Sequence, residues 1–250
     1  MDAETIHKTL AESLKKYATE YSFTKFVLGV SGGIDSAVTL KLAVDTFGTE
    51  NVTALIMPEN GLTKSENTAH AKGLCEFLGV QFYHQPINSF MLPYSEVSWK
   101  QKEMAYMNTK ARIRANLLYN YANSHTALVL GTSNKSELLL GYGTKHGDLA
   151  ADILPLGDLY KTQVYELADY MELPKEIIEK PPSAELAEGQ TDEAELGGSY
   201  KDLDIILEQR ELGEEDLIAK GMNAIMVRNV FRRMKDNKHK LETPPIIQIT

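Results

Sequence analysis

The sequence has 250 residues, a formal net charge of -9 at pH 7 and a single cysteine, Cys75. This length suits one large α/β domain, and no stretch approaches the ~20 apolar residues that a membrane-spanning helix needs. An acidic protein is a poor match for a long nucleic acid, whose phosphates bind basic surfaces. The first residues are acidic, unlike those of a secretory signal, and one cysteine cannot form an intramolecular disulfide. We therefore expect a cytoplasmic protein that binds neither nucleic acid nor membrane.

Short apolar runs alternate with helical patterns along the first half of the chain. The apolar runs predict buried strands at 26–30, 52–57, 81–87 and 127–130. Amphipathic spacing, caps and glycine stops predict helices at about 4–21, 36–47, 65–78, 99–123, 135–142, 161–171, 199–210 and 223–237. Strands that alternate with helices form βαβ units, so we predict a Rossmann-like α/β fold, a parallel sheet with helices on both faces. The second half is mostly helix and loop, which indicates one domain over 1–250 with a helical C-terminal extension.

The strongest local signal is the sequence Ser-Gly-Gly-Ile-Asp-Ser at 31–36, which follows the first predicted strand and opens a helix. Glycines let a backbone approach an anion, and the N–H groups at a helix start point at that anion. Asp35 would repel a phosphate unless a divalent cation lies between them, and Mg²⁺ prefers one or two carboxylates with phosphate oxygens and water. The plain alternative is a tight turn that binds nothing. The loop matches neither the Walker A sequence nor the dinucleotide-binding turn.

A second motif follows the fourth predicted strand and reads Gly-Thr-Ser-Asn-Lys-Ser-Glu-Leu at 131–138. The first motif resembles the pyrophosphate loop of the N-type ATP pyrophosphatases, which have an adenine nucleotide alpha-hydrolase-like fold. The second motif distinguishes among them, because it resembles that of the NAD synthetase family. The match extends over about 26–245 and includes the segments 141–147, 155–164, 180–183, 189–192 and 239–245, and also Asp152.

The resemblance implies roles for individual positions. ATP would contact the loop after the first strand and residues farther along: Gly29, Val30, Ser31, Gly32, Gly33, Ile34, Asp35, Ser36, Thr132, Lys161 and Ser183. Mg²⁺ would be held by Asp35 and Glu137. Deamido-NAD would contact residues of later segments: Arg112, Lys145, Asp152, His239 and Lys240. Catalysis would depend on Asp35, Glu137 and Lys161.

The chemistry of the side chains supports part of this assignment. Asp35 and Glu137 each follow the carboxyl end of a predicted strand, and open α/β sheets bind ligands there, where the strand order reverses. Lys161 is a point charge suited to phosphate, and Arg112 can bind a phosphate or carboxylate bidentately. Plain alternatives stand beside these roles. Glu137 fits an ordinary helix-start acid, Thr132 fits a helix cap, and the lysines and histidine fit solvated surface charge.

Three positions depart from the commonest form of the family, which has an aromatic residue at Gly143, tyrosine at His146 and glycine at Leu149. They lie in the segment expected to contact deamido-NAD, so they affect those contacts more than the reaction. The segment 181–198 is rich in proline, serine, glycine and acids, which predicts a mobile loop that closes over ATP.

The resemblance implies a two-step ligase reaction. The carboxylate of deamido-NAD attacks the α-phosphate of ATP to give an adenylate and pyrophosphate, and ammonia then displaces AMP to give NAD. Glutamine-dependent members carry a glutaminase domain with a catalytic cysteine, whereas this sequence starts with the helix before the ATP loop, so we expect free ammonia as the nitrogen source. Members of this kind are homodimers with deamido-NAD near the subunit interface, and we expect the same here.

Two other functions stay open at this point. One is a tRNA-modifying adenylyltransferase, which the acidic net charge and the lack of a cysteine pair disfavour. The other is an adenine-nucleotide sensor without turnover, which does not need both carboxylates, Asp35 and Glu137. The sequence shows no clear base for deprotonating ammonium, and Asp152 is one candidate.

Overall fold

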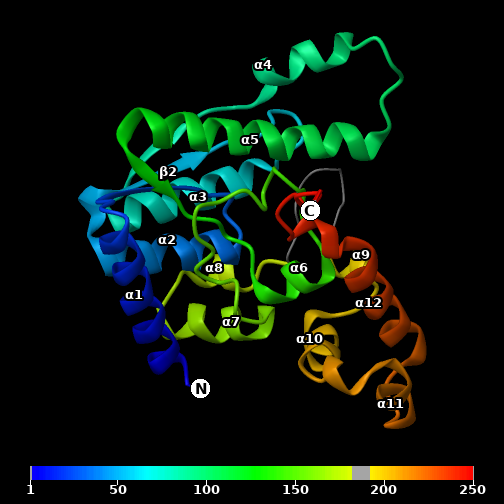
Figure 1. Ribbon diagram of the computed structural model, residues 1–250. Helices are drawn as coiled ribbons and strands as arrows, with labels where there is room; N and C mark the ends of the chain where they lie inside the picture. Colours follow the sequence, from blue (N-terminus) through cyan, green and yellow to red (C-terminus); the bar gives the residue numbers. More distant parts are fainter. Residues whose placement is uncertain (1, 182–191, 250) are drawn as a thin grey trace.

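A parallel sheet of four strands, in the order β3-β2-β1-β4, lies at the centre of the protein. The computed structural model describes residues 2–181 and 192–249. The strands are β1 (Lys25–Gly29), β2 (Val52–Ile56), β3 (Gln81–His84) and β4 (Ala127–Val129). The predicted α/β fold and all four predicted strands are confirmed (Figure 1).

Helices cover both faces of the sheet, because alternate side chains of each strand point in opposite directions. On one face, Phe26 and Leu28 of β1 pack in a core with α1 (Ala3–Glu20), α2 (Ile34–Phe47), α3 (Ser65–Leu78) and α7 (Lys161–Tyr170). Val27 lies between them in the strand and packs on the other face, with α4 (Asn88–Met91) and the long α5 (Glu103–His125). The hydrophobic effect therefore fixes both layers of helices on the sheet.

The strand order reverses beside β1. The chain runs from β1 outward through β2 to β3, and then returns to the opposite side of β1 as β4. The carboxyl ends of β1 and β4 therefore flank a crevice of the kind in which open α/β sheets bind ligands. Because α2 follows β1 and α6 (Lys135–Leu140) follows β4, the first turns of both helices lie at this crevice.

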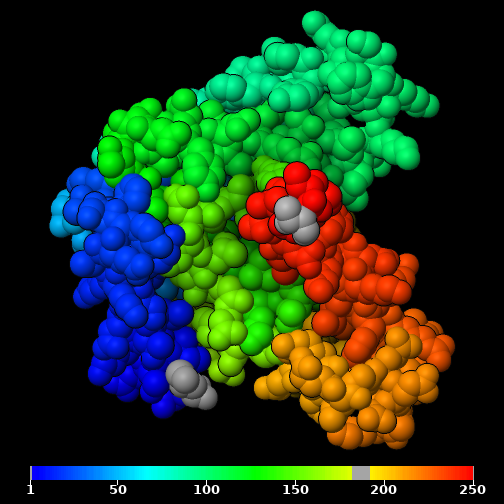
Figure 2. Space-filling model, viewed as in Figure 1, coloured from blue at the N-terminus to red at the C-terminus, as the bar shows by residue number. Residues whose placement is uncertain are grey.

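The C-terminal helices form a second core, which confirms the predicted helical extension. Leu203, Leu217 and Val227 of α10 (Tyr200–Glu208), α11 (Glu214–Ala219) and α12 (Ala224–Asn237) pack together with Leu140 of α6. After α12 the chain returns to the middle of the molecule in the view of Figure 1. Figure 2 shows these last residues, in red, against the green segment that follows β4.

Some element boundaries differ from the prediction. β3 ends at His84 rather than near 87, although the N–H groups of Gln85 and Ile87, on either side of Pro86, still donate to the carbonyls of Ile56 and Pro58. The helix predicted from 99 begins at Glu103. The structure also contains several short helices that the sequence did not predict. These are η1 (Thr49–Asn51), α4, η2 (Leu92–Glu96), α8 (Lys175–Ile178), α9 (Asp192–Leu196), η3 (Arg210–Leu212), α11 and η4 (Lys238–Lys240).

The loop predicted over 181–198 is wrong in its last part. Residues 192–196 form α9, and Leu196 is fully buried in the C-terminal core. Residues 182–191 lie outside the described residues. Within the described ranges, no helix is long and apolar enough to cross a bilayer.

Candidate active site

The loop after β1 has the shape of an anion-binding turn. Gly32 has a φ of 82°, and a Cβ there would lie 2.3 Å from the carbonyl oxygen of Asn67 in α3, so only glycine fits. Ser36 Oγ accepts from the Ser31 N–H at 3.2 Å and donates to the Gly33 carbonyl at 2.9 Å. The first N–H groups of α2 have no acceptor within the helix. They lie at the wall of a cavity and, with the helix dipole, favour an anion there.

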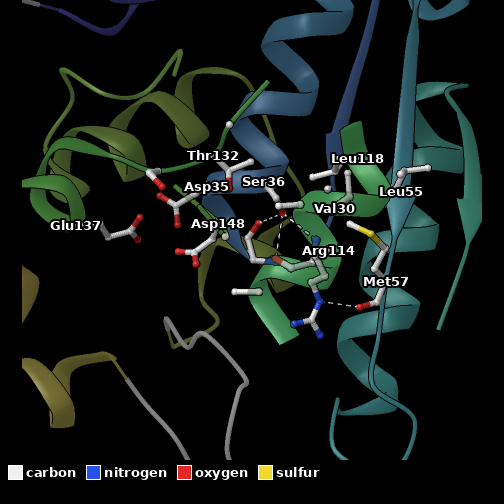
Figure 3. A pocket seen from close by; sticks show the side chains of 18 of the residues that line it. Val30, Asp35, Ser36, Leu55, Met57, Arg114, Leu118, Thr132, Glu137 and Asp148 are labelled. Carbon is white, nitrogen blue, oxygen red and sulfur yellow. Dashed lines mark hydrogen bonds between the residues drawn. The ribbon is translucent and has the colours of Figure 1, made fainter. Parts of the chain in front are cut away.

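This cavity has a volume of about 290 Å³ and lies at the carboxyl ends of β1, β2 and β4. Figure 3 shows the carboxylates of Asp35, Glu137 and Asp148 gathered on one side of it. The opposite side is apolar, with Val30, Leu55, Met57 and Leu118. Arg114 of α5 lies beside the apolar side chains, and its Nε donates to the Met57 carbonyl at 2.9 Å. One polar end and one apolar end suit a nucleotide.

Lys161, the first residue of α7, joins the two predicted metal carboxylates. Its Nζ donates to Asp35 Oδ2 and lies 3.6 Å from Glu137 Oε1, and the lysine side chain is only 2% exposed. Asn134 aligns both acids, because its Nδ2 donates to Asp35 Oδ1 at 2.9 Å and its Oδ1 accepts from the Glu137 N–H at 3.0 Å. The second bond belongs to a capping box at the start of α6. The structure thus brings together all three predicted catalytic side chains.

Several carboxyl groups lie close together around Lys161. Burial and the neighbouring Asp35 raise the pKa of Glu137 to about 8, although Lys161 opposes the shift. Burial disfavours the charge on Lys161, but Asp35 and Glu137 outweigh it and raise the pKa of the lysine above its usual value. Burial also raises the pKa of Asp192, whose oxygens accept from the hydroxyls of Tyr142 at 2.9 Å and Tyr200 at 3.2 Å. A further cation would stabilise these carboxylates.

Asp35 and Glu137 are the side chains best placed to hold such a cation. Among the described residues, no three His, Cys, Asp or Glu side chains form a ready-made metal cage. Mg²⁺ does not need one, because it takes one or two carboxylates and completes its shell with phosphate oxygens and water. The donor set therefore fits a metal that arrives with a nucleotide.

Four of the five residues predicted to contact deamido-NAD lie in one chain of contacts. Arg112 Nη2 donates to the Lys145 carbonyl at 3.2 Å, and Lys145 Nζ donates to the carbonyl of His239 at 2.5 Å. Lys240 Nζ donates to the carbonyls of Gly141 at 2.8 Å and Gly143 at 3.0 Å. These contacts join α5, the segment after α6 and the C-terminal turn η4.

Asp152 has a different set of partners. Its Oδ2 accepts from the Val129 N–H of β4 at 2.8 Å, and its Oδ1 accepts from the Tyr119 hydroxyl at 3.2 Å. Burial, followed by the charge of Asp152, raises the pKa of Tyr119 to about 12. Asp152 also lines a second, more open pocket with the aromatic side chains of Tyr17, Tyr21 and Tyr119. Asp152 therefore does not lie with the other four predicted residues.

Known proteins match this chain over its full length. The sequence model of the protein family NAD synthase matches residues 6–244. The chain belongs to the NAD synthase family. An NH(3)-dependent NAD(+) synthetase of Wolinella succinogenes is 42% identical over 243 residues, which cover 96% of this chain and 94% of the relative.

Two solved structures have the same fold as this family member. An NMN synthetase from Francisella tularensis has a TM-score of 0.87 and 34% identity, and the match covers 100% of both chains. An NH3-dependent NAD synthetase from Campylobacter jejuni has a TM-score of 0.86 and 33% identity, over 99% of this chain and 100% of the other.

Two of the three departures from the common family pattern, Gly143 and Leu149, lie against each other. A Cβ at Gly143 would lie 2.7 Å from Leu149 Cδ2 and 2.9 Å from Asp148 Oδ2. A side chain at 143 would therefore require Leu149 and Asp148 to move. His146 is exposed and has a positive φ of 61°.

Some of the other predicted ATP contacts line the cavity, and some residues of the site were not predicted. Thr132 lines the cavity, as does the loop from Gly29 to Ser36 apart from Gly32, whereas Ser183 lies outside the described residues. The role of Asn134 was missed, although its spacing of three from Glu137 is that of a capping box. Arg114, Asp148 and Asp192 also line the cavity and had no predicted role, although Asp192 lies in the segment 189–192 that resembles the family.

Proposed function

We propose that this NAD synthase adenylylates the carboxylate of deamido-NAD with ATP and then amidates it with ammonia. The observation that carries the proposal is the cavity at the crevice between β1 and β4, lined by the start of α2 and by Asp35, Glu137 and Lys161. Adenylyl transfer needs positioned substrates and neutralised charge rather than an enzyme nucleophile. The relatives named as NH(3)-dependent NAD(+) synthetases support the choice of substrate.

ATP would lie along the cavity. Its phosphates would accept hydrogen bonds from the N–H groups at the start of α2 and from Ser31, Ser36 and Thr132, and its base would lie against Leu55 and Leu118. Lys161 would approach the phosphates as a point charge. Ser183 stays a predicted ATP contact. Released pyrophosphate would be stabilised by the same N–H groups, because they favour negative charge.

Mg²⁺ would be held by Asp35 and Glu137. When bound, it supplies positive charge that neutralises the phosphate oxygens as the leaving pyrophosphate develops charge. Asn134 keeps Asp35 and Glu137 aligned through its amide, at 2.9 Å and 3.0 Å. The raised pKa of Glu137 supports this role, because such a carboxyl gains most from a nearby cation.

Deamido-NAD would contact Arg112, Lys145, His239 and Lys240 with its anionic groups. The side chains of Arg112, Lys145 and Lys240 now donate to backbone carbonyls, so a bound phosphate or carboxylate would replace weaker neutral acceptors with charged ones. The pocket beside Asp152 would take another part of the dinucleotide, because tyrosine rings can stack on a base or sugar.

Ammonia would attack the activated carbonyl carbon. The new C–N bond forms as the acyl C–O bond to AMP breaks, and AMP leaves with the bonding electrons. An ammonium ion must first lose a proton, and Asp148 is better placed for it than Asp152. Asp148 lines the cavity beside Glu137 and Asp35, whereas Asp152 does not line it and its oxygens already accept from the Val129 N–H and the Tyr119 hydroxyl.

Free ammonia is the proposed nitrogen source, because Cys75 does not suit a glutaminase nucleophile. It is fully buried in α3, and burial raises the pKa of its thiol to about 12. A reactive cysteine needs a lowered pKa and access to substrate. An unpaired buried thiol also agrees with the reducing conditions of a cytoplasm. Activity of the purified chain with glutamine alone would contradict this part of the proposal.

We propose a homodimer as the functional form and one functional unit over 1–250. Phe90, Leu92, Trp99 and Met104 are exposed along the segment from α4 to the start of α5, which projects at the upper right of Figure 2. Such apolar patches mark contact surfaces. The C-terminal helices share their core with α6 and supply Lys240, which supports a single unit. Sedimentation of a monomer at working concentration would count against the dimer.

A mononucleotide substrate is the second candidate, because one similar structure is described as NMN synthetase. The test supplies Mg²⁺, ATP and ammonium with either deamido-NAD or nicotinate mononucleotide, and counts amide product and AMP. We expect one AMP per NAD and a higher kcat/KM for deamido-NAD. A preference for the mononucleotide would move the assignment to the second candidate. ATP binding without AMP release would indicate the nucleotide sensor.

A further inference from the structure

A buried carboxylate of the C-terminal helices lies against the first turn of α7. Asp204 of α10 is 5% exposed, and both of its oxygens accept hydrogen bonds. Ser136 Oγ of α6 donates to Oδ1, and the Thr162 N–H of α7 donates to Oδ2 at 2.9 Å. Ser136 Oγ in turn accepts from the Lys161 N–H at 2.9 Å. α10 contacts both α6 and α7, and Figure 1 shows it below α6.

These bonds fix the backbone beside two predicted catalytic residues. Lys161 and Thr162 are the first two residues of α7, so Ser136 and Asp204 satisfy the first two N–H groups of that helix. Ser136 also directly precedes Glu137. One carboxylate therefore sets the position of both Lys161 and Glu137, whose charged atoms lie 3.6 Å apart.

We propose that Asp204 is a positioning residue for adenylyl transfer, which holds α6 and α7 so that Glu137 and Lys161 flank Asp35. The inference rests on the proposed function. Both partners donate, so both oxygens of Asp204 must accept, which a carboxylate can do and a carboxamide cannot. In Asp204→Asn, one buried donor would face an amide N–H, and the junction of α6 and α7 would shift to relieve it.

A purely structural cap makes a different prediction. It would lower the melting temperature and leave the turnover of the folded enzyme unchanged. A positioning role lowers kcat in folded protein, because a shift of about 1 Å at reacting groups can cost roughly 100-fold in rate. The KM for deamido-NAD would stay constant, because the contacts of Arg112, Lys145 and Lys240 do not pass through Asp204.

The test compares Asp204→Asn with Glu208→Gln, which changes an exposed carboxylate of the same helix. Each protein is assayed below its own melting temperature for kcat and both KM values, and calorimetry measures its affinity for ATP with Mg²⁺ and without deamido-NAD. We expect Asp204→Asn to lose about tenfold or more in kcat and roughly threefold in ATP affinity. The KM for deamido-NAD should change less than about twofold, and Glu208→Gln should match the wild type.

Ser136→Ala removes the bridging hydroxyl with little loss of volume and carries the same test if Asp204→Asn does not fold. Wild-type kcat and wild-type ATP affinity in a folded Asp204→Asn or Ser136→Ala protein would overturn the proposal. A wild-type protein that binds ATP and forms no NAD would instead contradict the proposed function. The ATP affinities of the variants would still test Asp204 in that case.

Discussion

Replacing Lys161 by methionine should destabilise the protein strongly. The lysine side chain is 2% exposed and balances Asp35 and Glu137, which are themselves only 18% and 15% exposed. Removing one partner of a buried ion pair costs about 3–5 kcal/mol, because the remaining charge stays buried. For a chain of this size that is a fall of roughly 6–20 °C in melting temperature. Thermal unfolding without Mg²⁺ or nucleotide measures it.

The loss should depend on pH in one direction. Removing the cation raises the pKa of Glu137 still further above its ordinary value of 4.5. A carboxyl whose pKa is raised on folding contributes stability below its unfolded pKa, and this contribution is lost as pH rises through the folded pKa. The destabilisation should therefore be smallest near pH 4.5 and largest above pH 8.

Lys135→Met is the matched control, because Lys135 pairs with Asp158, whose side chain is 94% exposed. Surface pairs of this kind contribute under about 1 kcal/mol. A Lys161→Met protein that melts with the wild type at pH 8 would refute the view that Lys161 offsets buried charge.

Three further predictions concern the site. Between pH 7 and 8, Mg²⁺ affinity in the presence of ATP should rise by up to about tenfold, because Glu137 with a pKa of about 8 must lose its proton to bind; calorimetry showing no pH dependence would contradict this. Gly32→Ala should abolish ATP binding, because the added Cβ would lie 2.3 Å from a backbone oxygen; retained affinity in a fluorescence titration would contradict it. Gly143→Phe should lower the melting temperature by clashing with Leu149, and the double variant with Leu149→Gly should recover it; equal melting temperatures of the single and double variants would argue against compensation.

The sequence predicted the central layers of the fold because their signals are local. Apolar runs such as 26–30 bury both faces of a strand, and a parallel sheet follows from their alternation with helices. Short helices were not predicted. For example, α8 and α11 are each about a turn or two long, and their burial depends on partners far along the chain. α9 was missed because the composition around Asp192 is typical of a loop.

Part of the site was predictable for the same reason. The loop at 31–36 and the pair Asp35 and Glu137 follow strand ends, and the chemistry of each is visible in a few consecutive residues. Asp204 was not predictable, because its role arises from packing of α10 on α6 and α7. Asp148 and Arg114 likewise could not be predicted, because they line the cavity only once distant segments of the chain have packed together.

An oxygen-isotope experiment tests the adenylylation step most directly. Deamido-NAD labelled with ¹⁸O in its carboxylate is converted with Mg²⁺, ATP and ammonium, and the products are analysed by mass spectrometry. If the carboxylate attacks the α-phosphate, one labelled oxygen must leave with AMP when ammonia forms the amide. We predict AMP that carries one ¹⁸O and pyrophosphate that carries none. Unlabelled AMP, or label in pyrophosphate or inorganic phosphate, would contradict the mechanism.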